Sequence, residues 1–451
     1  MTNLNKTPEA TEAPSAKVHA FSHDGRGIAT INHITTFIAG ALKGETVTYR
    51  ITQKRSSHHE AVMTEVQTPS PQRTTPPCSH FGVCGGCSLQ HMHPSMQVEL
   101  KQQTLLDQLK HFGKVTPESI LPALETAALG YRRKARLGVK FVIKKDKMLV
   151  GFREKAGRYL ADLNSCPVLY PAVGEKLTAL AALVRALEQY QSIPQIEVAV
   201  GDETVALVFR HLTPLPEADL AKLTAFGEEH QFHIYLQPNP PAAVHRLFPE
   251  GDDQRLHYTL PDFGLSYAFH PLDFTQVNLE MNRLMVKQAI TLLEPKANER
   301  VLDLFCGIGN FTLPLAKHAA HVTGVEGGQA MVERGFENAA LNGISNVAFY
   351  AANLMAETQT GEWAKQAYDK VLLDPPRAGA KEILPLLGQI QAKRIVYVSC
   401  NPATLARDAG ELVHLYGYCL KSVGIMNMFP HTAHIEAMAV FERSEKHGEL
   451  S

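Results

Sequence analysis

The C-terminal third of the chain constrains the fold most, because short apolar runs alternate there with longer amphipathic stretches. The runs are rich in Val, Ile and Leu, as strands are when both faces of their sheet are covered. Such alternation is typical of a doubly wound parallel sheet, which binds ligands at the carboxyl ends of its strands. The strands that we expect are Arg300–Cys306, His321–Glu326, Val347–Asn353, Lys370–Asp374 and Arg394–Ser399.

A glycine-rich turn follows the first of these strands. In Asp303-Leu-Phe-Cys-Gly-Ile-Gly, Gly307 and Gly309 allow the backbone to approach a ligand closely. A dinucleotide site usually has a third glycine, where this chain has Thr312, and the acidic residue before the glycines would repel a pyrophosphate. Glu326 ends the second strand, where a carboxylate can accept hydrogen bonds from ribose hydroxyls. The turn therefore favours an S-adenosylmethionine site. The alternatives are a nicotinamide site and a turn that only packs helix on strand.

A cysteine and an aspartate end two further strands of the expected sheet. Cys400, in Ser-Cys-Asn-Pro, lies just before Pro402, which suits the first turn of a helix. The field of that helix is expected to lower the pKa of the Cys400 thiol. Asp374, in Asp-Pro-Pro-Arg, is expected at the same edge of the sheet. A nucleophilic Cys400 is favoured because it shares the sheet with the glycine turn. The alternative is a small buried apolar residue.

The end of the chain predicts a different element. Tyr418–Met428 and His434–Glu442 have strand-like patterns and predict an antiparallel hairpin at the edge of the sheet. Such a hairpin can return Glu436 to the edge that carries Cys400. The alternative for Glu436 is a solvent-exposed carboxylate on a strand.

The N-terminal region differs from the rest in composition and charge. Residues 16–68 contain strand-like runs separated by glycine turns, on the scale of a small OB-like barrel. A polar tail (1–15) precedes this region, and a proline-rich linker (69–77) follows it. The first 150 residues carry 19 Lys and Arg against 11 Asp and Glu, although the net charge of the whole chain is −1. This basic excess favours a polyanionic partner, with a solvated surface as the alternative.

Four of the seven cysteines have the spacing of a metal site. Cys78, Cys84 and Cys87 form a C-x5-C-x2-C segment, and Cys166 precedes a proline further along the chain. Four thiolates can hold zinc or a [4Fe–4S] cluster. The single C-x2-C pair and the Cys-Pro favour the cluster. The odd number of cysteines argues against a disulfide framework. No apolar segment typical of a signal peptide is found near the N-terminus, so we expect the protein in the cytoplasm.

These features resemble the RNA uracil-C5-methyltransferase family over nearly the whole chain. The resemblance is greatest to the iron–sulfur-containing bacterial enzymes that act on 23S ribosomal RNA, of the uracil-1939 type. It is carried by the glycine-rich segment around 25–45, which is similar to a TRAM domain, by the four cysteines, by the Asp303–Phe311 turn, and by Ser399-Cys-Asn-Pro with Phe429-Pro-His-Thr-Ala-His-Ile-Glu436. One departure is Asp-Pro-Pro-Arg at 374–377, where the family pattern has Asp-Pro-Ala-Arg; the change leaves Asp374 in place.

The resemblance implies an α/β fold of three domains. Residues 296–451 would form a Rossmann-like class I methyltransferase sheet, and residues 16–68 an OB-like TRAM barrel. Residues 78–295 would form a central α+β domain. The resemblance also implies that this domain holds a [4Fe–4S] cluster through Cys78, Cys84, Cys87 and Cys166.

The resemblance also implies roles for individual residues. Cys400 would attack C6 of uracil as the nucleophile, and Glu436 would remove the C5 proton as the general base. The pocket for S-adenosylmethionine and uracil would be lined by Gln276, Phe305, Asn310, Glu326, Asn353 and Asp374. RNA contact, with a solvated strand edge as the alternative, is implied for Arg132, Arg133, Lys134 and Arg136.

The implied partner is 23S ribosomal RNA, and we expect a cytoplasmic monomer. No membrane-spanning segment is expected, because no apolar run reaches about 20 residues. One alternative function is a transfer-RNA uracil-C5-methyltransferase, against which the cysteines and the TRAM-like region argue. The other is a zinc-stabilised RNA-binding protein without activity, against which the presence of both Cys400 and Glu436 argues.

Overall fold

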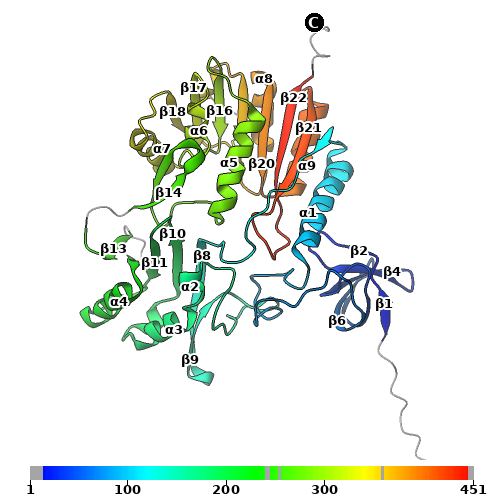
Figure 1. The fold of residues 1–451 in the computed structure, drawn as a ribbon, viewed down its shortest axis with the longest axis vertical. Coiled ribbons are helices and arrows are strands. Elements are labelled where there is room, and N and C mark those ends of the chain that lie inside the picture. The colour runs from blue at the N-terminus through cyan, green and yellow to red at the C-terminus, as the bar shows by residue number, and fades with distance from the viewer. Residues whose placement is uncertain (1–13, 239–243, 252–254, 357–359, 445–451) are drawn as a thin grey trace, which may run out of the picture. The chain divides into compact units, whose positions relative to one another are not determined.

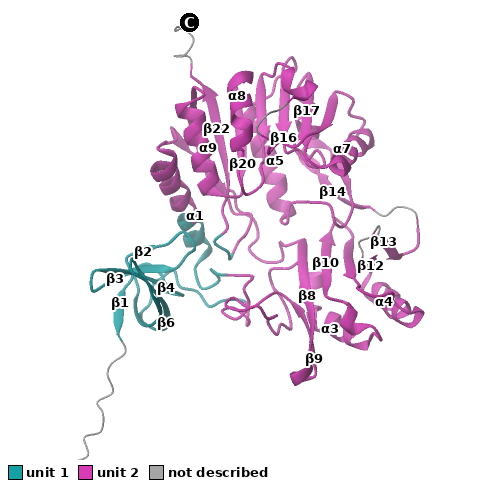
Figure 2. Cartoon of the chain, turned by 180° about the vertical axis from the view of Figure 1, so that it is seen from behind, with its two compact units in different colours: residues 1–77, 88–100, 431–433 teal, residues 78–87, 101–430, 434–451 magenta. Residues whose placement is uncertain are grey.

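The computed structural model describes residues 14–238, 244–251, 255–356 and 360–444 (Figure 1). Its internal contacts divide the chain into two compact units (Figure 2). Unit 1 comprises residues 1–77, 88–100 and 431–433, and unit 2 comprises residues 78–87, 101–430 and 434–451. The predicted tail at 1–15 lies almost wholly outside the described residues, and the three predicted domain boundaries stay predictions.

A sheet of short strands forms the first part of unit 1. Its strands are β1 (Ser15–Lys17), β2 (Ala20–Phe21), β3 (Gly27–Ile31), β4 (Ile34–Ala39), β5 (Thr46–Lys54) and β6 (His59–Thr68). The order is β1-β5-β6-β4-β3-β2, and β4 pairs with β6 in parallel. The predicted linker is held to this sheet, because Arg73 Nε lies 2.6 Å from the buried carboxylate of Glu45. Strands occur where the glycine turns predict them, while closure into an OB-like barrel stays a prediction.

Unit 2 contains a mixed sheet in its middle region, with the order β13-β12-β11-β10-β8-β9. Its elements are β8 (Lys134–Val142), β9 (Lys147–Gly151), α2 (Pro171–Gly174), α3 (Leu177–Ala186), β10 (Gln195–Val200), β11 (Val205–Arg210), α4 (Glu217–His230), β12 (Phe232–Gln237) and β13 (His245–Phe248). A two-stranded hairpin follows, formed by β14 (Leu256–Leu260) and β15 (Leu265–Phe269). The helix α1 (Pro94–Gln108) precedes this region in the chain.

The second sheet of unit 2 has the order β18-β17-β16-β19-β20-β22-β21-β7. Its elements are β7 (Ser119–Ile120), α5 (Leu279–Leu293), β16 (Arg300–Leu304), α6 (Thr312–Ala316), β17 (His321–Glu326), α7 (Gln329–Leu341), β18 (Val347–Ala351), β19 (Lys370–Leu373), α8 (Leu384–Ile390), β20 (Arg394–Ser399), α9 (Pro402–His414), β21 (Tyr418–Met426) and β22 (Glu436–Arg443). The strands from β18 to β20 are parallel, which confirms the predicted doubly wound sheet.

The predicted C-terminal hairpin is present, but it lies within the sheet. β22 is inserted antiparallel between β20 and β21, and the outer side of β21 pairs with β7. The hairpin therefore does not form the edge of the sheet, because the short strand β7, from a distant part of the chain, pairs with the outer side of β21.

Helices cover both faces of this second sheet, so its strands are buried. Val396 and Val398 of β20 join the core that includes Val286 and Ile290 of α5. Tyr397, which points to the opposite face, donates a hydrogen bond of 2.7 Å to Asp408 on α9. The continuous apolar runs that predicted the strands thus follow from burial on two sides. No helix in the part of the chain that the structure describes is long and apolar enough to cross a membrane.

A buried ion pair at the start of β19 gives a test of the fold. Lys370 Nζ lies 3.1 Å from Glu299 Oε2, and both side chains are buried. Replacing Glu299 by Gln leaves a buried ammonium without its anion, so we expect a loss of about 3–5 kcal/mol in the free energy of unfolding, measured by chemical denaturation. The exposed Lys365–Glu362 pair is the control: Glu362→Gln is expected to cost less than about 1 kcal/mol. Equal effects of the two substitutions would contradict this assignment.

Candidate active site

The register of two antiparallel strands brings Cys400 and Glu436 together. Ser399 at the end of β20 pairs with Ala437 near the start of β22. Extending this register by one residue sets Cys400 opposite Glu436, at a Cβ separation of about 5 Å. Glu436 is buried, with 8% of its surface exposed, whereas Cys400 is half-buried. The exposed-carboxylate alternative for Glu436 is therefore wrong, and so is a fully enclosed Cys400.

Asp374 is the third titratable group of the site, after Cys400 and Glu436. It follows β19, whose Leu373 pairs with Tyr397 of β20, so Asp374 ends its strand beside the end of β20. Burial raises the pKa of Asp374 to about 7. Burial and the charge of Asp374 together raise the pKa of Glu436 to about 8. The site therefore resists carrying several negative charges at once.

The expectation that a helix N-terminus lowers the pKa of Cys400 is wrong. Burial and the carboxylates of Glu436 and Asp374 raise the pKa of this thiol to about 11. The helix is present, since α9 begins at Pro402 with Asn401 as its cap. Its field falls off within one turn, and two nearby carboxylates and desolvation outweigh it.

The predicted glycine turn has the backbone that a close approach to a ligand requires. Phe305, Gly307 and Gly309 all have positive φ, and a Cβ added to Gly307 would meet no atom within 4 Å. The turn therefore faces open space. Glu326 lies against it, because the N–H of Gly307 donates to Glu326 Oε2 at 3.0 Å. These residues fit a nucleoside with a cationic tail, although the cofactor residues themselves stay predictions.

The expectation that the carboxylate of Asp303 repels a pyrophosphate is wrong. Asp303 is fully buried, and it accepts a hydrogen bond of 2.6 Å from Thr312. Burial outweighs this bond and raises its pKa to about 8, assisted by Asp374 and Glu326. A carboxyl group that is mostly protonated at pH 7 does not repel a pyrophosphate. Its structural role is to join the end of β16 to the start of α6.

The other predicted cofactor residues lie around this turn. Asn310 accepts a hydrogen bond of 2.9 Å from Tyr258 and exchanges two with Asn282. Asn353 follows β18, and its side chain accepts from the N–H of Met355 at 3.1 Å. Protein contacts thus orient the side chains of Asn310 and Asn353.

Gln276 is in a loop between β15 and α5 that buried charges support. Arg334 on α7 lies 3.0 Å from the carboxylate of Asp273, and both side chains are buried. Lys134 donates to the carbonyl oxygens of Pro271 and, at 2.9 Å, of Asp273. The loop is therefore held from two sides.

The basic run at 132–136 has internal partners that the sequence did not reveal. Arg133 donates to the carbonyl of Gly201 and lies over the ring of Tyr170. Lys134 is bound to the Gln276 loop, and burial lowers its pKa to about 8. Arg136 is largely exposed beside Glu197, and Arg132 donates to the carbonyl of Lys134. RNA contact by these four residues stays a prediction, and Arg136 is the one of them that offers most of its side chain to solvent.

The four predicted metal-binding cysteines are half-buried on two connected segments. His80 lies 2.6 Å from Asn164 Oδ1, which joins the Cys78–Cys87 segment to the segment of Cys166. The N–H of Gly86 donates to the sulfur of Cys84 at 3.4 Å. Burial and the charges of Cys166 and Cys78 raise the pKa of Cys84. The described residues contain no group of three or more His, Cys, Asp or Glu that could hold a metal ion, so the predicted cluster is not confirmed.

Three residues near the site were missed by the sequence analysis. Burial and the charges of Arg377, Lys101 and Arg132 all lower the pKa of His434. Arg377 follows the Asp-Pro-Pro motif and also interacts with Cys400. The position of Arg377 next to the Asp-Pro-Pro motif is a sequence signal that places it near the site. Lys101 and His434 have no sequence signal as clear.

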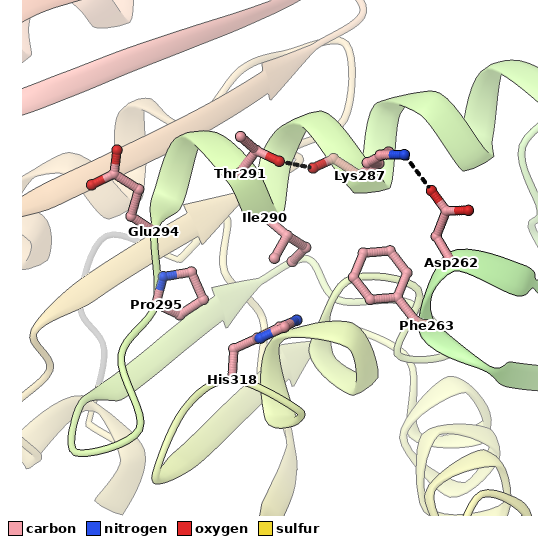
Figure 3. A pocket seen from close by; sticks show the side chains of 8 residues that line it. All are labelled: Asp262, Phe263, Lys287, Ile290, Thr291, Glu294, Pro295 and His318. Carbon is pink, nitrogen blue, oxygen red and sulfur yellow. Dashed lines mark hydrogen bonds and ion pairs between the residues drawn. The ribbon is translucent and has the colours of Figure 1, made fainter.

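A separate surface pocket lies on another part of unit 2 (Figure 3). It has a volume of about 580 Å³ and is lined by Asp262, Phe263, Lys287, Ile290, Thr291, Glu294, Pro295 and His318. None of these residues belongs to the predicted site.

A solved structure shares the fold of nearly the whole chain. It is a tRNA (uracil-54, C5)-methyltransferase of Pyrococcus abyssi in complex with S-adenosyl-L-homocysteine, and it covers 96% of this chain and 100% of its own. The TM-score is 0.73 at 22% sequence identity. The fold is therefore that of the α/β methyltransferases.

Sequence comparison defines the family. Residues 95–444 match the family described as tRNA (Uracil-5-)-methyltransferase. A 23S rRNA (uracil(1939)-C(5))-methyltransferase of Hahella chejuensis is 52% identical over 96% of this chain and 98% of its own. One of the same name from Alkalilimnicola ehrlichii is 54% identical over 94% and 96%. The chain belongs to this uracil-C5-methyltransferase family.

The elevated pKa of Cys400 can be tested by alkylation. We expect the rate of Cys400 modification by iodoacetamide, followed by peptide mass spectrometry, to rise with pH beyond pH 10. At pH 9, Glu436→Gln removes a negative charge beside the thiol, so the modification becomes several-fold faster. Glu442→Gln, at the far end of β22, is the control and leaves the rate unchanged. A rate that levels off near pH 8 would contradict the assignment.

Proposed function

We propose that the protein transfers a methyl group from S-adenosylmethionine to C5 of a uridine in 23S ribosomal RNA. The observation that carries the proposal is that the Ser399–Ala437 register places the next residue, Cys400, beside Glu436, and that the charges of Glu436 and Asp374 both act on the Cys400 thiol. A nucleophile and a general base are the two groups that this chemistry needs, because C5 of uracil is a poor nucleophile.

The reaction follows from these two groups. Cys400 first loses its thiol proton to solvent. The thiolate then bonds to C6 of uracil, and the electrons of the C5–C6 double bond move to give an enolate with its charge at C5 and O4. S-adenosylmethionine would supply the methyl group on a cationic sulfonium: the bond from C5 to the methyl carbon forms as the methyl–sulfur bond breaks, and S-adenosylhomocysteine leaves as a neutral thioether. Glu436 then accepts the C5 proton, the double bond re-forms, and the C6–S bond breaks with its electrons returning to Cys400.

The remaining residues have supporting roles in this proposal. The Gly307–Gly309 turn and Glu326 would hold the nucleoside and its cationic tail, because the turn faces open space beside a carboxylate. Asp374, which burial keeps partly protonated near pH 7, would hydrogen-bond to the uracil edge. The target base has to leave its stack to reach Cys400, and Arg132 and Arg377 would bind the RNA around it.

Ribosomal RNA is favoured over transfer RNA as the substrate. The relatives with 52% and 54% identity are named for 23S rRNA, whereas the structure named for tRNA has 22% identity and supports the fold alone. Methylation of 23S rRNA and tRNA transcripts, compared in vitro, tests this choice. A cytoplasmic location and a monomeric state remain expectations.

We propose further that Cys78, Cys84, Cys87 and Cys166 hold a [4Fe–4S] cluster. The sulfurs of Cys78, Cys84 and Cys166 interact electrostatically, and Gly86 provides an N–H donor to one of them. A Cβ at Gly85 would lie 3.1 Å from the carbonyl of Arg153, so this loop is packed too tightly for a side chain. Such a cluster would link the Cys78–Cys87 segment to the segment of Cys166 through iron–sulfur bonds.

Two substitutions test the mechanism. We expect Cys400→Ala to abolish both methylation and covalent RNA complexes, because no other group supplies the bond to C6. We expect Glu436→Gln to accumulate a covalent enzyme–RNA complex on denaturing gels, since the C5 proton then has no acceptor. Glu442→Gln, on the same strand, is the control and leaves turnover unchanged. Methylation by Cys400→Ala would contradict the mechanism.

Anaerobic purification tests the cluster. We expect about four irons and four inorganic sulfides per chain. Cys166→Ala is expected to lose most of the iron, while Cys419→Ala, outside the four, retains it. Stoichiometric zinc without sulfide would contradict the assignment and favour a zinc site.

A further inference from the structure

A lysine lies on the buried face of α1. Lys101, Thr104 and Leu105 are all buried, at the spacing that lines one face of a helix, and only 1% of the surface of Lys101 is exposed. A lysine in such a position is costly, because burial of an ammonium loses its hydration. Its retention on this face requires partners that compensate for that loss.

The direct partners of Lys101 are neutral oxygens. Its Nζ donates to Asn427 Oδ1 at 2.7 Å and to the carbonyl oxygen of Phe429 at 2.9 Å. Both residues are in the connection between β21 and β22, and Met426 at the start of that connection pairs with Glu436 at its end. Lys101 therefore holds the loop from which Glu436 emerges.

The charge of Lys101 is balanced by Glu436. Burial lowers the pKa of Lys101 to about 7, and Glu436 opposes that effect. In return, Lys101 opposes the burial and the Asp374 charge that raise the pKa of Glu436. The other titratable groups coupled to this pair are Cys400, whose pKa Glu436 raises, and His434, whose pKa Lys101 lowers. Of all these groups, Lys101 is the one whose charge lowers the pKa of Glu436.

We propose that Lys101 is a positioning residue for Glu436, which holds the Asn427–Phe429 segment and favours the ionised form of the Glu436 carboxyl group that accepts the C5 proton. The proposal rests on the proposed function of Glu436 as the base. Without the cation, the pKa of a carboxyl group buried beside Asp374 rises further, so a smaller fraction of it is ionised near neutral pH and can accept a proton. The lysine would therefore affect resolution of the covalent complex and leave its formation largely intact.

The test is single-turnover kinetics of the full-length protein on a 23S rRNA fragment, as a function of pH. Methyl transfer from labelled S-adenosylmethionine and loss of the covalent complex on denaturing gels are followed separately. We expect Lys101→Met and Lys101→Gln to transfer the methyl group but to resolve the complex at least tenfold more slowly at pH 7. The acid limb of resolution moves to higher pH by about one unit.

Two further variants separate charge from packing. Lys101→Arg keeps the cation and is expected to restore the wild-type pH profile, and Lys110→Met, an exposed lysine just beyond α1, leaves it unchanged. The proposal is overturned if Lys101→Met and Lys101→Gln keep the wild-type profile, or if Lys101→Arg is as defective as Lys101→Met. A Glu436→Gln protein that accumulates no covalent complex would instead remove the base assignment itself, and the role of Lys101 with it.

Discussion

The site depends on the antiparallel insertion of β22 between β20 and β21. The parallel strands bring the glycine turn, Asp374 and Cys400 to the end of the sheet where these strands terminate, but none of the parallel strands begins there. An antiparallel strand begins where its parallel neighbours end, and the register Ser399–Ala437 makes Glu436 the residue opposite Cys400. A shift of one residue in this register would turn the carboxylate to the other face of the sheet.

This arrangement has an electrostatic consequence. A thiol and two carboxyl groups share a partly buried region, where Asp374 raises the pKa of Glu436 and both carboxylates raise the pKa of Cys400. In the proposed mechanism, the protein needs a thiolate first and a carboxylate later, so the protons have to be redistributed during turnover. Lys101, when protonated, offers a positive charge that lowers the pKa of Glu436, and the sulfonium of the methyl donor would supply a second positive charge.

The sequence predicted those features that depend on local pattern. The parallel strands follow from apolar runs covered on two faces, and the turn at Gly307 and Gly309 follows from its position between strand and helix. The insertion of β22 next to β20 was not predictable, because a hairpin pattern specifies its two strands but not their order in a sheet.

The errors at the site have the same origin in tertiary contacts. The helix that follows Cys400 predicts a lowered pKa, whereas burial, together with the carboxylates of Glu436 and Asp374, raises it. RNA contact by Lys134 stays a prediction from its basic run, and the run does not reveal that its ammonium is bound to the loop of Gln276. Lys101 was overlooked because a single lysine in a helix is usually on its exposed face. For Glu436, by contrast, the sequence offers two alternatives, a position near Cys400 or an exposed strand carboxylate, and its burial rules out the second.

The most direct test is the covalent bond itself. RNA that carries 5-fluorouridine at the target position cannot lose a proton from C5, so the bond from sulfur to C6 persists after methyl transfer. Incubation with the protein and S-adenosylmethionine, followed by digestion and mass spectrometry, identifies the peptide that carries the nucleotide. The account predicts a methylated fluorouridine attached to Cys400. A nucleotide on another residue, or methyl transfer without any covalent complex, would contradict it.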